Sequence, residues 1–145
     1  MSKHITIIDD DEDDRLFFRE ALKSSGIDAV YNEYVNGETF LAQMENPSAT
    51  QPDFIFLDIN IPRIDGYDIL NAIRKYDNYD DTKVIMFTTS QSEDDILKAM
   101  QSHASGFATK PVDYKVLENT IKNVVTHFTV PQTQHLFLTI VNPEE

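Results

Sequence analysis

The sequence predicts an α/β fold of the flavodoxin-like type, a doubly wound, five-stranded parallel sheet of order 2-1-3-4-5 with helices on both faces. Five short apolar runs alternate with longer segments that have helical spacing. Two of these runs, FIFL and VIMF, are apolar throughout, as expected of strands that are covered on both faces. The order and lengths of the segments fit strand–helix units with right-handed crossovers better than they fit hairpins.

The predicted elements follow one another without an internal repeat or a low-complexity linker. The strands are expected at residues 5–8, 29–35, 54–57, 84–87 and 106–108, and the helices at 14–24, 37–44, 67–74, 93–103 and 113–127. An Asp-rich stretch precedes the first helix, which suits a helix N-terminus, and Gly26 is expected to end that helix. Pro111 lies just before the start of the last helix.

Composition limits the classes of function. The chain has 145 residues, of which 41% are hydrophobic, enough for one core. Its 12 Lys and Arg against 25 Asp and Glu give a net charge of −13, which disfavours nucleic acids and anionic membranes and favours cations or a basic partner surface. The absence of cysteine excludes disulfides and zinc–thiolate sites. Because it has neither a secretory signal nor a membrane-length apolar run, we expect a cytoplasmic protein.

Polar residues follow the predicted strands at the edge where ligands bind in such sheets. These residues are Asp9, Asp10, Asp58, Thr88 and Lys110. Three neighbouring carboxylates repel one another, so we expect a cation between them. Mg²⁺ prefers oxygen ligands, and together with Lys110 it would balance the three negative charges. This arrangement predicts phosphoryl transfer, with Asp58 as the nucleophile that becomes an acyl phosphate and Lys110 and Thr88 as donors to the new oxygens.

Each of these residues also has a purely structural interpretation. A Thr that ends a strand is commonly explained by β-propensity, and a Lys before Pro is commonly a loop residue. We assign the acids at 11–14 to a solvated helix start rather than to the site. The prediction of a site therefore depends on the whole set of residues and not on any single one.

Four motifs carry a resemblance to a known family. They are IIDD at 7–10, FLDINIPRIDGYDIL at 56–70, VIMFTTS at 84–90 and ASGFATKP at 104–111. In order and separation they resemble the receiver domains of bacterial response regulators over residues 3–128. The resemblance implies that Asp58 is the phosphoacceptor and that Asp10 binds Mg²⁺ directly. It also implies that Asp9 acts through a metal-bound water and that the backbone carbonyl of Asn60 is a further ligand.

The resemblance also implies a switch. Thr88 matches the switch hydroxyl, Lys110 the lysine that pairs with the phosphoryl group, and Phe107 the switch aromatic, which is often Tyr. Asn60 and Ser90 match positions that tune the lifetime of the phosphoryl group. In the family the bond between Lys110 and Pro111 is cis.

Partners follow from the same resemblance. The phosphodonor histidine would belong to a sensor histidine kinase or a histidine phosphotransfer protein, and output would pass to a downstream protein effector without direct contact to nucleic acid. The chain would then be a single-domain switch, not an enzyme, that catalyses only its own phosphorylation and dephosphorylation. The fourth helix, fifth strand and fifth helix would form the output face.

The tail at 129–145 lies beyond the resemblance. It contains the apolar, β-rich run 136–141, which would promote aggregation if left bare. We expect an extra strand or arm that packs either on its own domain or on a second copy in a homodimer.

Three rival classes share some of these features. A dehalogenase-like phosphatase would need an acid where Asn60 stands and a metal-binding acid pair after the lysine in sequence. A flavin binder would need a phosphate-binding loop where this chain has six acids. A receiver-like domain that works without phosphorylation would usually lack one of the acids, the Thr or the Lys, all of which are present.

Overall fold

The computed structural model describes residues 2–141 and confirms the predicted fold class. Its elements are, in order, β1 (Lys3–Ile8), α1 (Glu12–Ser25), β2 (Ala29–Tyr34), α2 (Gly37–Met44), β3 (Phe54–Leu57), α3 (Gly66–Ile73), a 3₁₀ turn (Asp77–Tyr79), β4 (Lys83–Thr88), α4 (Glu93–Gln101), β5 (Gly106–Thr109), α5 (Tyr114–Thr129) and β6 (Leu138–Ile140). The sheet is parallel with order β2-β1-β3-β4-β5-β6. The predicted number of five strands was therefore wrong by one.

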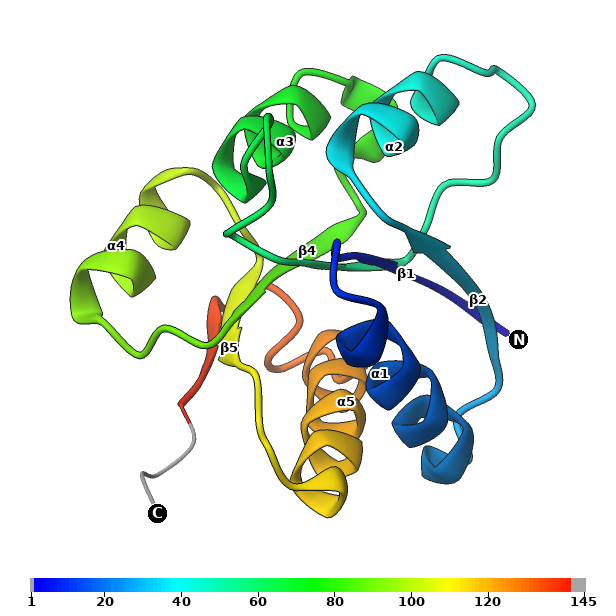
Figure 1. The fold of residues 1–145 in the computed structure, drawn as a ribbon. Helices are drawn as coiled ribbons and strands as arrows, with labels where there is room; N and C mark the ends of the chain where they lie inside the picture. Colours follow the sequence, from blue (N-terminus) through cyan, green and yellow to red (C-terminus); the bar gives the residue numbers. More distant parts are fainter. Residues whose placement is uncertain (1, 142–145) are drawn as a thin grey trace.

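The sheet separates two helical layers, with α2, α3 and α4 on one face and α1 and α5 on the other (Figure 1). Strand β3 contributes to both cores, because successive side chains of a strand point to opposite faces. Ile55 and Leu57 lie in the core beneath α2 to α4, whereas Phe54 and Phe56 lie in the core beneath α1 and α5. All four are buried, which explains why this run has no polar residue.

Side-chain caps set where the helices begin. The Asp11 carboxylate accepts a hydrogen bond from Asp14 N at 2.9 Å, so α1 begins two residues before the predicted start. Asn36, Asp65, Ser92 and Asp113 cap the other four helices in the same way. Helix α4 is shorter than predicted, since His103 has a left-handed backbone with φ 66°.

The C-terminal apolar run packs on its own domain, as strand β6 beside β5. Leu138 N donates to Ser105 O at 3.2 Å, and the β6 register pairs Thr139 with Phe107. Phe137 contacts the core on the α4 side, whereas Leu138 and Ile140 contact the core on the α5 side. Strand β6 therefore covers the edge of β5 that the predicted five-stranded sheet would leave free.

Within residues 2–141, none of the helices has the length and apolarity needed to cross a bilayer.

Candidate functional site

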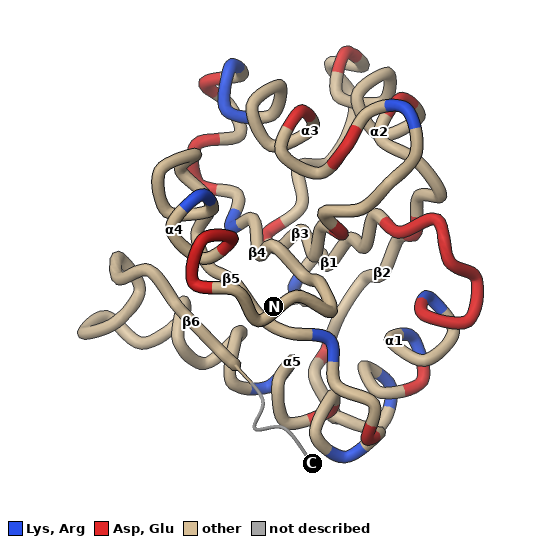
Figure 2. Tube along the Cα trace, turned by 60° about the vertical axis from the view of Figure 1, so that its left-hand side comes forward, with Lys and Arg blue, Asp and Glu red and all other residues tan. Residues whose placement is uncertain are grey.

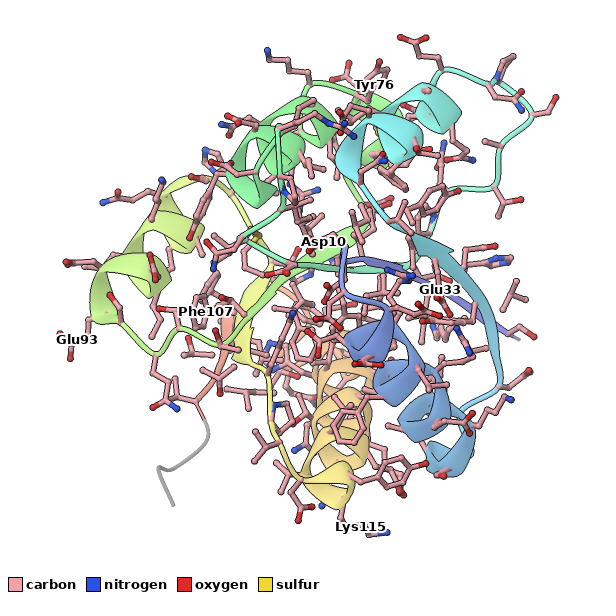
Figure 3. The ribbon with its side chains drawn as sticks, in the orientation of Figure 1. Asp10, Glu33, Tyr76, Glu93, Phe107 and Lys115 are labelled. Carbon is pink, nitrogen blue, oxygen red and sulfur yellow. The ribbon has the colours of Figure 1, made fainter. Side chains whose placement is uncertain are left out.

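The predicted site residues meet at the C-terminal edge of the sheet. Strands β1, β3, β4 and β5 are neighbours, and the residues that follow them border one open cavity of about 570 Å³. The cavity is lined by Asp10, Asp11, Glu12, Asp13, Asp14, Asp58, Asn60, Thr89 and Lys110. Figure 2 shows the acids between β1 and α1 as a continuous run beside this edge. In Figure 3, Asp10 lies where β1 ends.

Three carboxylates cluster at this end of the sheet, and two of them, Asp10 and Asp58, line the cavity. Asp9 and Asp58 are buried and Asp10 is exposed, and one oxygen from each lies within 4.8 Å of the others. Burial raises the pKa of Asp9 to about 6 and holds the pKa of Asp58 above its ordinary value. Clustered carboxylate oxygens are the hard ligands that Mg²⁺ and Mn²⁺ prefer, so these residues fit a divalent cation.

Backbone groups hold two of the acids in place. The Asp9 carboxylate accepts from Asp11 N at 3.0 Å, and the Asp58 carboxylate accepts from Asn60 N at 3.2 Å. Helix α3 packs against the chain just after Asp58, where Gly66 N donates to Ile59 O at 2.9 Å. A Cβ on Gly66 would lie 2.4 Å from Asp58 O, so only glycine permits this approach.

Lys110 supplies the positive charge of the site. Its backbone N donates to Thr88 O at 2.7 Å, which ties the end of β5 to the end of β4. Its ammonium lies 2.7 Å from Asp9 Oδ2, 2.9 Å from Asp14 Oδ2 and 3.3 Å from Asp58 Oδ2. Burial alone would lower the pKa of Lys110, but these carboxylates raise it above its ordinary value, so the ammonium stays charged.

The predicted switch residues lie behind the cavity. Thr88 and Phe107 are both completely buried, and it is Thr89 that lines the cavity. Thr88 Oγ1 accepts a hydrogen bond from Ser90 N at 3.3 Å, and the Ser90 hydroxyl donates to the Asp95 carboxylate at the start of α4. Phe107 lies on β5 within the core beneath α2 to α4 (Figure 3).

Two predictions at the site need correction. The assignment of Asp14 to a solvated helix start was incomplete, because Asp14 also bonds Lys110. Both interpretations hold together, since the first turn of α1 faces the end of β5. The cis bond before Pro111 was wrong, because residues 2–141 contain no cis peptide bond.

Arg15 and Glu33 contribute to the site without having been predicted. Arg15 Nη1 donates to Asp9 O at 2.8 Å, and its Nε donates to Glu33 Oε1 at 3.1 Å. Glu33 lies on β2 and also accepts from Arg19 at 2.6 Å (Figure 3). In sequence Arg15 resembles any charged residue of an amphipathic helix, and the register of β1 and β2 is needed to bring Glu33 to it.

Comparison with known proteins decides the family. A family model described as the response regulator receiver domain matches residues 5–122. The chain belongs to this family. Receiver domains are the phosphoacceptor switches of two-component systems.

The chain is 29% identical to the response regulator Rcp1 of Synechocystis sp. over 126 residues, which cover 84% of this chain and 86% of that protein. It is 30% identical over 121 residues to the sensor histidine kinase CheAY of Helicobacter pylori, covering 83% of this chain but 15% of the kinase. The chain therefore spans a small part of that kinase.

Two solved structures of response regulators share the fold. The phosphorylated cyanobacterial phytochrome response regulator RcpA aligns with a TM-score of 0.76 and 27% identity, covering 86% of this chain and 91% of that chain. The Mn²⁺-bound form of Rcp1 aligns with a TM-score of 0.75 and 25% identity, covering 98% and 99%.

Proposed function

We propose that this receiver domain accepts a phosphoryl group on Asp58, in a Mg²⁺-dependent reaction, from the phosphohistidine of a sensor kinase or a histidine phosphotransfer protein. One observation carries the proposal: Asp58 borders an open cavity, with Lys110 at 3.3 Å and two further carboxylates beside it. Phosphoryl transfer needs a nucleophile, a positively charged side chain and a pair of acids that bind a metal ion. Asp58, Lys110 and the pair of Asp9 and Asp10 would fill these roles.

Asp9, Asp10, Asp58 and the backbone carbonyl of Asn60 would hold Mg²⁺. When bound, the ion supplies neutralisation of charge on the phosphoryl oxygens and on the acids around them. The cluster of three carboxylates supports this assignment, as does the bound Mn²⁺ in the related Rcp1. Burial of Asp9 raises its pKa by disfavouring the ionised form, and a bound cation would stabilise that form.

The transfer itself is a displacement at phosphorus. An oxygen of the Asp58 carboxylate attacks the phosphorus, the P–N bond to the donor histidine breaks, and its electron pair stays on the imidazole. Asp58 becomes an acyl phosphate with more negative charge and more acceptor oxygens. Lys110, which lies beside Asp58, would donate to one of these oxygens.

Thr88 and Phe107 would convert this chemistry into a change of surface. The Thr88 hydroxyl accepts from Ser90 N and would turn toward the phosphoryl oxygens as a donor. Such a movement changes the packing beside Phe107 on the neighbouring strand, beneath α4. The two packings then form a two-state element that phosphorylation biases.

The output surface would be built from α4, α5 and β6. Strand β6 covers the edge of β5, so the predicted output face now presents β6 in place of β5. Leu97 and Met100 of α4 and Leu136 before β6 are exposed and would contact a protein partner or a second copy of the chain. The net charge of −13 argues against nucleic acid as the direct target.

The test is phosphorylation with a small acyl phosphate, followed by intact mass measurement with and without Mg²⁺. We expect the mass of one phosphoryl group in the wild type with Mg²⁺, and none in Asp58→Asn. Asp13→Asn, which neutralises an acid of the same cavity, should still be modified. Equal modification of Asp58→Asn, or no modification of the wild type under any condition, would contradict the proposal.

A further inference from the structure

Asp14 forms an ion pair with Lys110 but does not belong to the cluster of three acids that could hold a cation. It is in the first turn of α1, and its carboxylate lies 2.9 Å from the Lys110 ammonium. The cation cluster consists of Asp9, Asp10 and Asp58, and Asp14 is not a member. Asp14 therefore faces the ammonium without sharing the proposed cation.

The Lys110 ammonium is held by two hydrogen bonds, one to Asp9 and one to Asp14, and forms a longer ion pair with Asp58. A lysine carries three N–H donors, and Asp9, Asp14 and Asp58 lie around Lys110 at 2.7, 2.9 and 3.3 Å. A phosphoryl group on Asp58 brings new acceptor oxygens that need one of these donors. A donor that turns toward these oxygens draws the ammonium from Asp9 or Asp14, so one of these two hydrogen bonds weakens.

Asp14 is the partner best placed to release Lys110. The Asp9 side chain is 1% exposed and the Asp58 side chain 10%, whereas that of Asp14 is 45% exposed. Water can solvate a released Asp14 carboxylate, but a buried carboxylate that loses its partner stays desolvated. The longest of the three contacts is the one to the phosphoacceptor itself, as expected if Asp14 draws the ammonium away from it.

We propose that Asp14 is a positioning residue that holds Lys110 in the unphosphorylated chain and competes with the phosphoryl group for it. The inference rests on the proposed function of Asp58. Removal of the Asp14 carboxylate should leave Lys110 bound to Asp9 and free to donate to the phosphoryl oxygens. Asp14 would thus set how strongly this domain holds its phosphorylated form.

The experiment measures the affinity of the Mg²⁺-loaded chain for beryllium fluoride, a phosphoryl mimic, by calorimetry or ¹⁹F NMR. We expect Asp14→Ala to bind about 2- to 5-fold more tightly than the matched control Asp13→Ala, since a partly exposed ion pair has that strength. Asp13 is the adjacent exposed acid of the same helix turn and cavity, so it reports the general effect of losing one charge. Asp14→Asn, whose amide still accepts a hydrogen bond, should show a smaller gain.

A second arm repeats Asp14→Ala in a Lys110→Gln background, where the gain should disappear because no ammonium remains to be released. Equal affinities of Asp14→Ala and Asp13→Ala would overturn the competition, as would weaker binding by Asp14→Ala or a gain that persists in Lys110→Gln. Failure of the wild-type chain to bind the mimic at all would instead overturn the proposed function, and this inference with it.

Discussion

Neutralising Asp9 should stabilise the metal-free protein at neutral pH. Burial raises the pKa of this carboxyl from 3.8 to about 6 in the folded chain, despite its bond to Lys110. At about 1.4 kcal/mol for each unit of pKa, the ionised form costs about 3 kcal/mol of folding free energy. The cost is absent below the unfolded pKa, grows as the pH rises from 3.8 toward about 6, and is complete above that value.

The assay is urea unfolding of wild type and Asp9→Asn in the presence of a chelator. The Asp9 carboxylate uses one oxygen toward Asp11 N and the other toward Lys110, whereas an amide has only one acceptor oxygen. The stability lost with that hydrogen bond is the same at each pH, so it cancels when the difference between variant and wild type is compared at two pH values. The stability of Asp9→Asn minus that of wild type should increase by about 1–3 kcal/mol between about pH 4 and about pH 7.5. A difference that does not change with pH would refute this reasoning. Saturating Mg²⁺ should reduce the difference in stability between Asp9→Asn and wild type at neutral pH, because the ion would stabilise the ionised Asp9 of the wild type.

Other predictions follow from close backbone contacts and from the switch. Gly66→Ala places a Cβ 2.4 Å from Asp58 O, so we expect a loss of about 3 kcal/mol or more in urea unfolding, together with loss of phosphorylation. Gly106→Ala places a Cβ 2.8 Å from Leu138 O, so we expect β6 to separate from β5 at a cost of about 1–3 kcal/mol, with faster amide exchange in β6 and phosphorylation retained. A fully protected β6 in Gly106→Ala would contradict the close packing of the two strands. Thr88→Ala should still gain a phosphoryl group, but the NMR shifts that beryllium fluoride causes near Phe107 should be lost; unchanged shifts would exclude Thr88 as the link.

Much of the fold could be predicted because strands that are buried on both faces of the sheet contain only apolar residues. The runs FIFL and VIMF are apolar on both sides of the sheet, and the structure has their residues in both cores. The helix boundaries were predicted less accurately, because side-chain caps and not the apolar pattern determine them. Asp11 caps α1, so this helix begins two residues before the start that its apolar pattern predicts. The position of β6 could not be derived, since an apolar run does not say whether it packs on its own sheet or on another copy.

The site was predictable where position in the fold selects the residue. Thr88 ends a parallel strand, and Asp9, Asp10, Asp58 and Lys110 lie just after the ends of others, so the sheet order alone brings them to one edge. Asp14 was assigned to the helix start because sequence spacing does not show that the first turn of α1 faces Lys110. Arg15 and Glu33 meet only through the packing of α1 beside β2, which no local pattern reports.

The central claim is that the phosphoryl group is carried as an acyl phosphate on Asp58. Borohydride reduces an aspartyl phosphate to homoserine, so the modified residue can be located by peptide mass spectrometry after phosphorylation with Mg²⁺. We predict homoserine at position 58 and unchanged peptides for Asp9 and Asp10. Homoserine at any other acid, or phosphorylation of a hydroxyl or histidine with position 58 unchanged, would contradict the account.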